Sequence, residues 1–441
     1  RDRSAGGGSA LGCSRVSRAQ RATSAATTTA HLHPQQQRAG LRARHARSLR
    51  SYVRDDKLGT NVSNNDDGGE EAGPSLADLR GEMESFLERN SYTYNERRNG
   101  NGASTANGNG NGSTLDMMTV ITQPVASEMQ QQTDGLRNIV GERHPLLTAA
   151  SEHLFQAGGK RVRPLIAILV AKATRKLYGM NDVTDEHIRL AMITEMIHTA
   201  SLVHDDVLDD CELRRGNSTV HSLYGTRVAV LAGDFLFAQS SWFLANLNNL
   251  EVIKLISQVI ADFADGEIAQ ASSLFDTEIT ISKYLDKSFY KTASLVAASC
   301  RSAAVFSDCS EQEKQHMYDY GCNLGLAFQI VDDILDFTQT EEELGKPQGQ
   351  DLASGNITAP AILVLGDSPR LQHLLKEDKL ESQGALQEAL QLVYDNNGIE
   401  KAKQLARHHG DLALAALQIL PDCEEKHSLG LMVEYVLERI S

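Results

Sequence analysis

The chain has 441 residues, of which 41% are hydrophobic, and its formal net charge at pH 7 is −15. This length and composition are enough to bury one large core or two ordinary domains. The excess of acidic residues excludes a general nucleic-acid binder, because binding to phosphate backbones needs clustered Lys and Arg.

The first 54 residues differ in charge from the rest of the chain. They contain eleven Arg, one Asp and no Lys, a net charge of +10, which leaves −25 for the remainder. They are also rich in Ser, Ala, Thr and Gly and contain no long apolar run. This composition is typical of an organelle transit peptide, whereas a secretory signal would need an apolar segment. An ordinary disordered tail is the alternative interpretation.

Residues 55–115 are predicted to be a disordered linker. They include the low-complexity run 99-NGNGASTANGNGNGS-113, which is too polar to bury a core. The folded domain is therefore expected to span residues 116–441. The six cysteines are scattered and form no CxxC pair, so neither a zinc site nor a disulfide framework is expected. No stretch reaches about 18 uninterrupted apolar residues, so the sequence predicts no transmembrane segment.

The folded domain is predicted to be helical throughout. No proline occurs between Pro164 and Pro347, and apolar residues recur at steps of three and four, as in 226-TRVAVLAGDFLFAQSSWFLANL-247. The same pattern continues in 399-IEKAKQLARHHGDLALAALQIL-420. We therefore predict an all-α fold, a single large helical bundle of ten or more helices.

Two groups of aspartates each follow an apolar helix. The first is 205-DDVLD-209 and the second is 332-DDILD-336. Positions i and i+4 share one face of a helix, so like charges placed there destabilise it unless a cation compensates. Mg²⁺ suits such a site because it binds one or two carboxylates and completes its shell with water and substrate phosphates. One DDxxD alone is equally consistent with a solvated helix end, but two copies favour a metal site.

Phosphate-binding residue types accompany the aspartates. Guanidinium groups grip phosphate oxygens through paired hydrogen bonds, and the two glycines of 158-GGKRVRP-164 let the backbone approach an anion. Any one of these residues could be an ordinary surface charge. Their concentration beside the aspartates of an acidic protein predicts a diphosphate site. The candidate donors are Lys160, Arg163, Arg214, Arg215, Lys291, Thr292 and Lys346.

Five motifs give the chain a family resemblance. In order they are GGKRVRP, LVHDDVLDDCELRRG, YKTASL, FQIVDDILDF and GKPQGQDLASGNITAP. Across about residues 135–441 the chain resembles the trans (E-type) polyprenyl diphosphate synthases, and within them the long-chain plant and cyanobacterial branch of solanesyl diphosphate synthases. The branch is indicated by ASSLFDTEITISKYLDKSFYKTASL, by the absence of an insertion in DDVLD, and by GNITAP. Many family members have GKxTxP there, so Asn356 replaces a lysine and removes one phosphate donor.

The resemblance implies roles for individual residues. Asp205 and Asp209 would be Mg²⁺ ligands supported by Asp206, and Asp332 and Asp333 would form the second metal face. His198 lies two helical turns before Asp205; a lone His on an apolar helix is usually a core residue, but here contact with phosphate is expected. The allylic diphosphate would be held by Arg214, Lys291, Thr292, Gln329 and Lys346. Isopentenyl diphosphate would be held by Lys160, Arg163, His198 and Arg215.

The resemblance also implies a fold of the isoprenoid synthase type with a central apolar cavity, and a reaction. The expected reaction is the Mg²⁺-dependent, sequential condensation of isopentenyl diphosphate onto farnesyl or geranylgeranyl diphosphate, which supplies a quinone side chain. Preorganised charge would stabilise the departing diphosphate, and apolar helices would keep water from the carbocation. Ala200 and Ser201 precede Asp205 by five and four residues. Their small side chains would leave a product channel open, although helix packing could also require them.

Three other functions are compatible with parts of this pattern. A class I terpene cyclase shares DDxxD and an all-α fold, but its second metal motif has an Asn/Ser/Glu or Asp/Thr/Glu pattern, which 332-DDILD-336 lacks. A non-catalytic regulatory subunit generally loses aspartates from one group, and both are intact here. A geranylgeranyl diphosphate synthase remains the second interpretation. The resemblance further implies a homodimer, a plastid location with mitochondrion second, and peripheral membrane association for product release.

Overall fold

The computed structural model describes residues 112–137, 144–156, 159–214, 216–339, 348–378, 380 and 383–440. The predicted targeting segment and most of the predicted linker lie outside these ranges. The first described helix begins at Gly112, four residues before the expected start of the folded domain. The described helices thus start close to the expected residue, and the limits of the domain stay a prediction.

Helices make up almost all of the described chain, which confirms the predicted all-α class. The first half contains α3 (Gly112–Thr122), η1 (Gln123–Val125), α4 (Ala126–Arg137), α5 (Pro145–Gln156), α6 (Val162–Lys176), α7 (Asp185–Leu208), α8 (Val220–Tyr224), α9 (Thr226–Ala245) and α10 (Leu250–Ser272). Within the described residues, strands occur as one antiparallel pair, β1 (Leu213–Arg214) with β2 (Asn217–Ser218). This pair turns the chain back directly after the first aspartate group.

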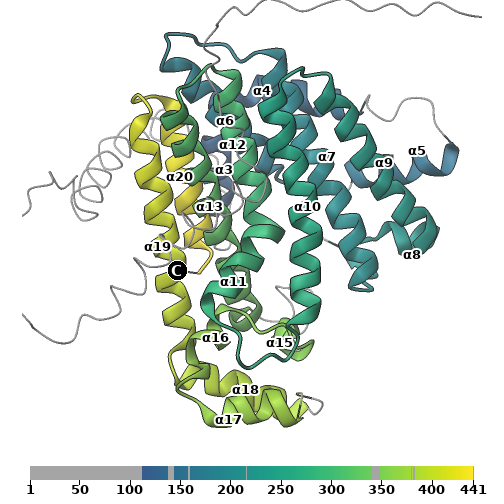
Figure 1. Ribbon diagram of the computed structural model, residues 1–441, viewed down its shortest axis with the longest axis vertical. Helices are drawn as coiled ribbons and strands as arrows, with labels where there is room; N and C mark the ends of the chain where they lie inside the picture. The colour runs from purple at the N-terminus through teal and green to yellow at the C-terminus, as the bar shows by residue number, and fades with distance from the viewer. Residues whose placement is uncertain are drawn as a thin grey trace, which may run out of the picture. The chain divides into compact units, whose positions relative to one another are not determined.

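The second half completes the bundle. It contains α11 (Ile281–Ser288), the π-helical turn η2 (Phe289–Ala293), α12 (Ser294–Phe306), α13 (Glu311–Thr338), α15 (Gln350–Ala353), α16 (Ala359–Leu365), α17 (Pro369–His373), η3 (Leu374–Asp378), α18 (Gln383–Asp395), α19 (Gly398–Ala416), η4 (Leu417–Ile419) and α20 (Glu424–Glu438). Helix α13 packs against α12 and α19, and α7 packs against α6, α9 and α12 (Figure 1). The two helices that carry the aspartate groups are therefore both joined to α12.

Local sequence fixes where α7 and α13 begin. At the start of α13, the Ser310 amide donates to Glu313 and the Glu313 amide donates to the Ser310 hydroxyl, a reciprocal cap. At the start of α7, the Thr184 amide donates to Nδ1 of His187 at 3.1 Å. These caps fix the residues at which both helices begin.

Two glycines on α13 allow close contact with α12 and η2. A Cβ atom on Gly321 would lie 2.7 Å from the carbonyl oxygen of Val296, and one on Gly325 would lie 2.6 Å from Cα of Ala293. Real Cβ atoms do not approach backbone atoms so closely, so any larger residue would force the helices apart. The spacing of four residues puts both glycines on one face, and this face holds α13 against the element that carries Lys291 and Thr292.

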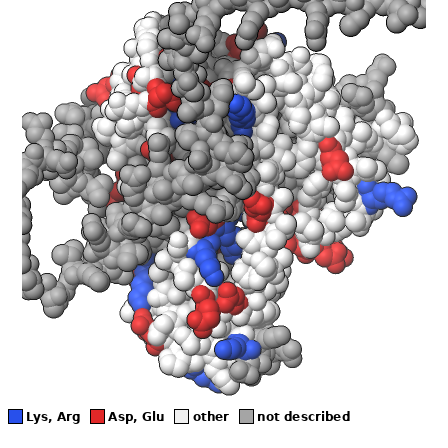
Figure 2. Space-filling model, in the orientation of Figure 1, with Lys and Arg blue, Asp and Glu red and all other residues white. Residues whose placement is uncertain are grey.

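Helix α9 exposes an unusually apolar face. Val230, Leu231 and Trp242 are exposed on α9, and Leu250 and Ile268 are exposed on α10. Charged side chains are sparse over these two helices in Figure 2. Among the described residues, α9 is also the one helix long and apolar enough to cross a membrane, judged by length and composition, with 33% of that stretch buried. A single helix of this kind is weak evidence for a membrane span, because core helices pass the same test.

Five cysteines fall in the described part of the chain, at positions 211, 300, 309, 322 and 423, and they form no disulfide there. Burial raises the pKa of Cys300 well above its usual range. A buried thiol held in its neutral form behaves as a small apolar core residue.

Candidate active site

The first aspartate group lies at the end of α7. Asp206 is buried and accepts a 2.5 Å hydrogen bond from Nε of Arg214, which the β1–β2 pair turns back toward it. Asp205 is half-buried, and burial raises its pKa to about 6, with Lys291 opposing that shift. Asp209 is exposed at the C-terminal cap. Carboxylates removed from water in this way need positive charge nearby.

The second aspartate group lies near the end of α13. Asp333 is buried, accepting hydrogen bonds from the Tyr284 hydroxyl at 2.5 Å and from Nε2 of Gln329 at 2.9 Å. Burial raises the pKa of Asp333 well above its ordinary value, while these hydrogen bonds act in the opposite direction. Asp332 is half-buried and pairs with Arg439, and Asp336 is buried and accepts from the Asp351 amide at 3.2 Å.

Lys291 connects the two groups. Its ammonium forms a 2.6 Å ion pair with Glu267 of α10. Burial alone would lower the pKa of Lys291, but Asp205 and Glu267 raise it by more. The same lysine lines a small cavity with Asp333. Lys291 is half-buried, and members of both aspartate groups lie in its surroundings.

Next to Lys291, a chain of hydrogen bonds crosses from η2 to α13. The Thr292 hydroxyl donates to Oε1 of Gln329 at 2.6 Å, and Gln329 in turn donates to Asp333. This contact depends on the glycine face of α13 described above. Thr292 and Gln329, both implied as allylic-site residues, are thus held in fixed orientations.

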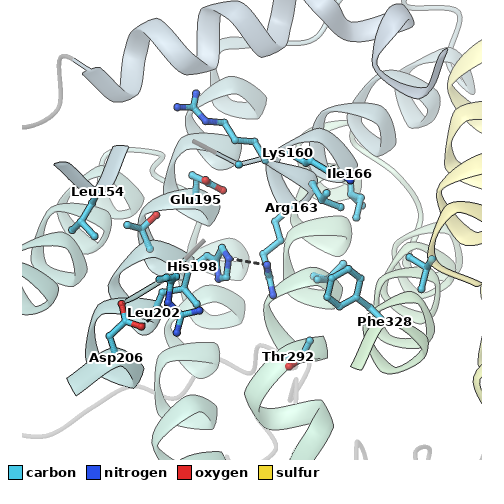
Figure 3. Close-up of a pocket in the computed structure, with 18 of the residues that line it drawn as sticks. Leu154, Lys160, Arg163, Ile166, Glu195, His198, Leu202, Asp206, Thr292 and Phe328 are labelled. Carbon is cyan, nitrogen blue, oxygen red and sulfur yellow. Dashed lines mark hydrogen bonds and ion pairs between the residues drawn. The ribbon is translucent and has the colours of Figure 1, made fainter. Parts of the chain in front are cut away.

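A pocket of about 500 Å³ opens beside these groups and is lined by three of the four predicted isopentenyl-site residues, Lys160, Arg163 and His198. In Figure 3 the Arg163 guanidinium points toward the ring of His198, to which it donates a 2.9 Å hydrogen bond. Lys160 lies at the pocket edge and donates to the Tyr435 hydroxyl. Arg214 also lines this pocket. An anion entering it would meet side chains from α6, α7 and the β1–β2 pair.

Other predicted residues fall elsewhere. Arg215 and Lys346 lie outside the described residues. Ala200 is fully buried and Ser201 is half-buried, with the Ser201 hydroxyl donating to the His198 carbonyl at 2.9 Å. Neither lines the 500 Å³ pocket, whose α7 wall is formed by Glu195, His198, Thr199, Leu202 and Asp206. Their proposed role in chain length therefore stays a prediction.

The donor set of the two aspartate groups fits Mg²⁺ shared with a diphosphate. The carboxylates are hard oxygen ligands, and burial raises the pKa of Asp205, Asp206 and Asp333. Among the described residues, however, no three His, Cys, Asp or Glu side chains gather into a ready-made metal cage. Mg²⁺ is commonly held by one or two carboxylates and substrate phosphates, so an incomplete protein shell is what such a site requires.

Sequence reasoning missed residues that reach the site from α11 and α20. Tyr284 donates to Asp333, Tyr435 contacts Lys160, and Arg439 pairs with Asp332 at 2.6 Å. Tyr435 and Arg439 are four residues apart, so they share one face of the last helix. The spacing of this tyrosine and arginine along the last part of α20 was the available indication.

Comparisons with known proteins agree with this arrangement. The family model "Polyprenyl synthetase" matches residues 144–393. The chain is 56% identical over 320 residues to "Solanesyl-diphosphate synthase 2, chloroplastic" of Oryza sativa subsp. japonica, covering 73% of this chain and 79% of that protein.

Two solved structures are also similar. One is a decaprenyl diphosphate synthase from Rhodobacter capsulatus, with a TM-score of 0.69 and 31% identity over 74% of this chain and 99% of that one. The other is a polyprenyl synthase from Caulobacter crescentus complexed with calcium and isoprenyl diphosphate, with a TM-score of 0.67 and 30% identity over 74% and 98%. Both likenesses extend over nearly the whole length of the solved chains.

Proposed function

The chain belongs to the polyprenyl synthetase family and is a long-chain trans-polyprenyl diphosphate synthase, a prenyltransferase, and from that premise we propose that its product is solanesyl diphosphate, made in the plastid as a quinone side chain. Support for this product comes from the solanesyl synthase of rice, 56% identical over 320 residues. The observation that carries the assignment of the site is the position of Lys291, whose pKa is raised by Asp205 of the first aspartate group and which lines a cavity with Asp333 of the second.

The chemistry requires heterolytic cleavage of an allylic C–O bond. The resulting cation is attacked by the double bond of isopentenyl diphosphate, a proton is lost, and the product is an allylic diphosphate one unit longer. The barrier falls when fixed positive charge faces the oxygen that departs. Mg²⁺ held by Asp205, Asp209, Asp332 and Asp333 would supply part of that charge.

The remaining charge comes from the protein itself. We assign Arg214, Lys291, Thr292 and Gln329 to the allylic diphosphate because they lie at or between the aspartate groups. We assign Lys160, Arg163 and His198 to isopentenyl diphosphate because they line the adjoining pocket (Figure 3). Arg215 and Lys346 are proposed for the same two diphosphates on the resemblance alone. Apolar residues of that pocket, including Leu202 and Phe328, limit access of water to the cation.

We propose a homodimer that uses the exposed face of α9 and α10. This face carries Leu231, Trp242, Leu250 and Ile268 without a covering element in the described part of the chain. Large exposed apolar side chains in one region are typical of subunit interfaces. A charged substitution such as Trp242→Glu should shift the molar mass measured by light scattering from dimer to monomer.

The organelle and the allylic primer are proposed independently of the reaction. The arginine-rich composition of residues 1–54 supports targeting to an organelle, and the chloroplastic rice relative favours a plastid over a mitochondrion. We propose farnesyl or geranylgeranyl diphosphate as primer and peripheral membrane association for release of the long apolar product. A fusion of residues 1–54 to a fluorescent protein, followed in plant cells, decides between the two organelles.

Product analysis tests the function. Purified protein is incubated with labelled isopentenyl diphosphate, farnesyl diphosphate and Mg²⁺, and the dephosphorylated products are sized by chromatography. We expect a nine-unit chain, and loss of at least about 10³-fold in rate in Asp205→Ala and in Asp332→Ala. A four-unit product would indicate a geranylgeranyl diphosphate synthase, and no product in the wild type would indicate a non-catalytic subunit.

A further inference from the structure

A buried lysine that has no role in the description above lies behind the second aspartate group. Lys287 is the second-to-last residue of α11, and only 7% of its surface is exposed. Its ammonium donates a 2.6 Å hydrogen bond to Oδ1 of Asn356. Lysine is among the residues least often buried, because taking an ammonium out of water is costly unless it is compensated. The position of Lys287 therefore calls for an explanation.

The charges around Lys287 show what it faces. Burial lowers the pKa of Lys287, and the carboxylates of Asp333 and Asp351 act in the opposite direction. The next cation along the chain is Lys291, four residues later, which acts on Lys287 as a like charge. Lys287 also lines one small cavity with Asp333 and Lys291, so it stands beside the second aspartate group and beside a residue already assigned to the allylic diphosphate.

The partner of Lys287 is the residue at which this chain departs from the family motif. Asn356 lies in GNITAP, where many family members have a lysine. The amide oxygen of Asn356 accepts a hydrogen bond from the ammonium of Lys287, so the end of the Lys287 side chain lies directly beside position 356. The positive charge that the loop after α15 does not supply is delivered from α11 instead. A change of lysine to asparagine alone would leave that place uncharged.

A small cavity of about 20 Å³ adjoins this place. It is lined by Lys287, Lys291, Gln329, Asp333 and Asn356 among others. A space of this size accommodates about one water molecule, and by the same measure one oxygen atom of a phosphate. Two of its lining residues, Lys291 and Gln329, are those we assign to the allylic diphosphate.

We propose that Lys287 is a further binding residue for the allylic diphosphate, whose ammonium takes the place of the lysine missing at position 356. It donates to a phosphate oxygen at the side of the site formed by α11 and the loop that carries Asn356. This inference rests on the proposed function of the site. The competing explanation is that Lys287 only neutralises Asp333 and Asp351 and never contacts substrate.

The test uses the full chain and three variants. Lys287→Met removes the charge while keeping the length of the side chain. The exchange variant Lys287→Asn with Asn356→Lys moves the lysine to the loop and preserves the net charge. Lys283→Met is the matched control, because Lys283 is one turn earlier on the same helix and exposed. Binding of an unreactive farnesyl thiolodiphosphate is measured by calorimetry with Mg²⁺, together with the KM for each substrate.

We expect Lys287→Met to bind the analogue about tenfold more weakly, because a charge-assisted hydrogen bond to phosphate is lost. The KM for isopentenyl diphosphate should stay within about twofold of the wild type. The exchange variant should recover most of the lost affinity, and Lys283→Met should bind as the wild type does. If Lys287 were only a structural counter-ion, its removal would not weaken binding of the allylic analogue selectively, with the KM for isopentenyl diphosphate unchanged.

Two results would overturn the proposal. The first is a folded Lys287→Met protein that binds the analogue as tightly as the wild type. The second is a folded exchange variant that binds it no better than Lys287→Met. Should Lys287→Met fail to fold, the exchange variant decides alone. Binding of the analogue at wild-type affinity would support the proposal, and binding well below wild-type affinity would overturn it. A wild-type protein that forms no polyprenyl product would instead refute the proposed function.

Discussion

Arg439, the C-cap residue of α20, donates a 2.6 Å hydrogen bond to Asp332 on α13, so the last helix of the chain contacts the second aspartate group directly. The same guanidinium lies 5.3 Å from the centre of the Phe328 ring and lines the 500 Å³ pocket. Arg439 is therefore placed between a proposed metal ligand and the pocket assigned to isopentenyl diphosphate.

Removing this arginine should weaken binding in the pocket. For Arg439→Met we expect the KM for isopentenyl diphosphate to rise about tenfold, because a charge-assisted contact of about 1.4 kcal/mol is lost. Steady-state kinetics with each substrate varied in turn measures this. Arg370→Met is the control, since Arg370 pairs with Glu388 on the exposed surface. Equal KM values in wild type and Arg439→Met would show that the arginine does not serve the pocket.

A bulky side chain below the first aspartate group should shorten the product. Ser201 is half-buried, so Ser201→Phe can be accommodated more easily than Ala200→Phe, which would overpack a fully buried position at a cost of about 1–3 kcal/mol. We expect Ser201→Phe to yield chains several units shorter, as sized by chromatography. Arg189→Phe, on the exposed face of α7, should leave chain length unchanged. An unaltered product from Ser201→Phe would contradict the channel assignment.

The fold class and the main site residues could be predicted because they depend on local pattern. Steps of three and four between apolar residues, and the absence of proline from 165 to 346, are sufficient to indicate long helices. The i, i+4 spacing within each aspartate group places its members on one side of a helix wherever that helix packs. Asp205 and Asp333 accordingly lie near the C-terminal ends of two long helices, α7 and α13.

Contacts between distant segments could not be predicted in the same way. Lys160 meets Tyr435 across 275 positions, and Asp332 meets Arg439 across 107. Periodicity assigns a residue to a face but does not say which other face it will meet. Lys287 shows the same limit: its sequence neighbours identify a helix, and only the packing of α11 against the loop at Asn356 reveals its partner.

Close packing at Gly325 should be essential for stability and for the site. Gly325→Ala would place a methyl group 2.6 Å from Cα of Ala293, so α13 must move away from η2. We expect a loss of about 2–3 kcal/mol in the free energy of unfolding and a higher KM for the allylic substrate, since the Thr292–Gln329 contact spans this gap. Gly384→Ala is the control: nothing lies within 4 Å of its Cβ, so this change in α18 should be neutral or slightly stabilising. Urea unfolding of both variants provides the comparison.

His187 should make the stability of the protein depend on pH. Its Nδ1 accepts from the Thr184 amide and its Nε2 lies 3.1 Å from the Ala303 carbonyl, so the neutral ring satisfies both contacts. Burial lowers the pKa of His187 from 6.5 to about 4. The unfolded chain therefore binds the proton more tightly, and the contribution is fully present above about pH 6.5 and declines as pH falls toward 4.

The size of this effect can be isolated with a variant that does not titrate. Between pH 7.5 and pH 5.0 the linkage amounts to about 2 kcal/mol of unfolding free energy for a shift of this size. We expect the wild type to lose about that much more than His187→Gln over the same interval, as measured by urea unfolding followed by circular dichroism. Because His187→Gln removes the cap at Thr184, it should be less stable than the wild type at pH 7.5, so the comparison concerns the slope with pH. Parallel losses in both proteins would mean that His187 is already protonated in the folded state or is not buried as described.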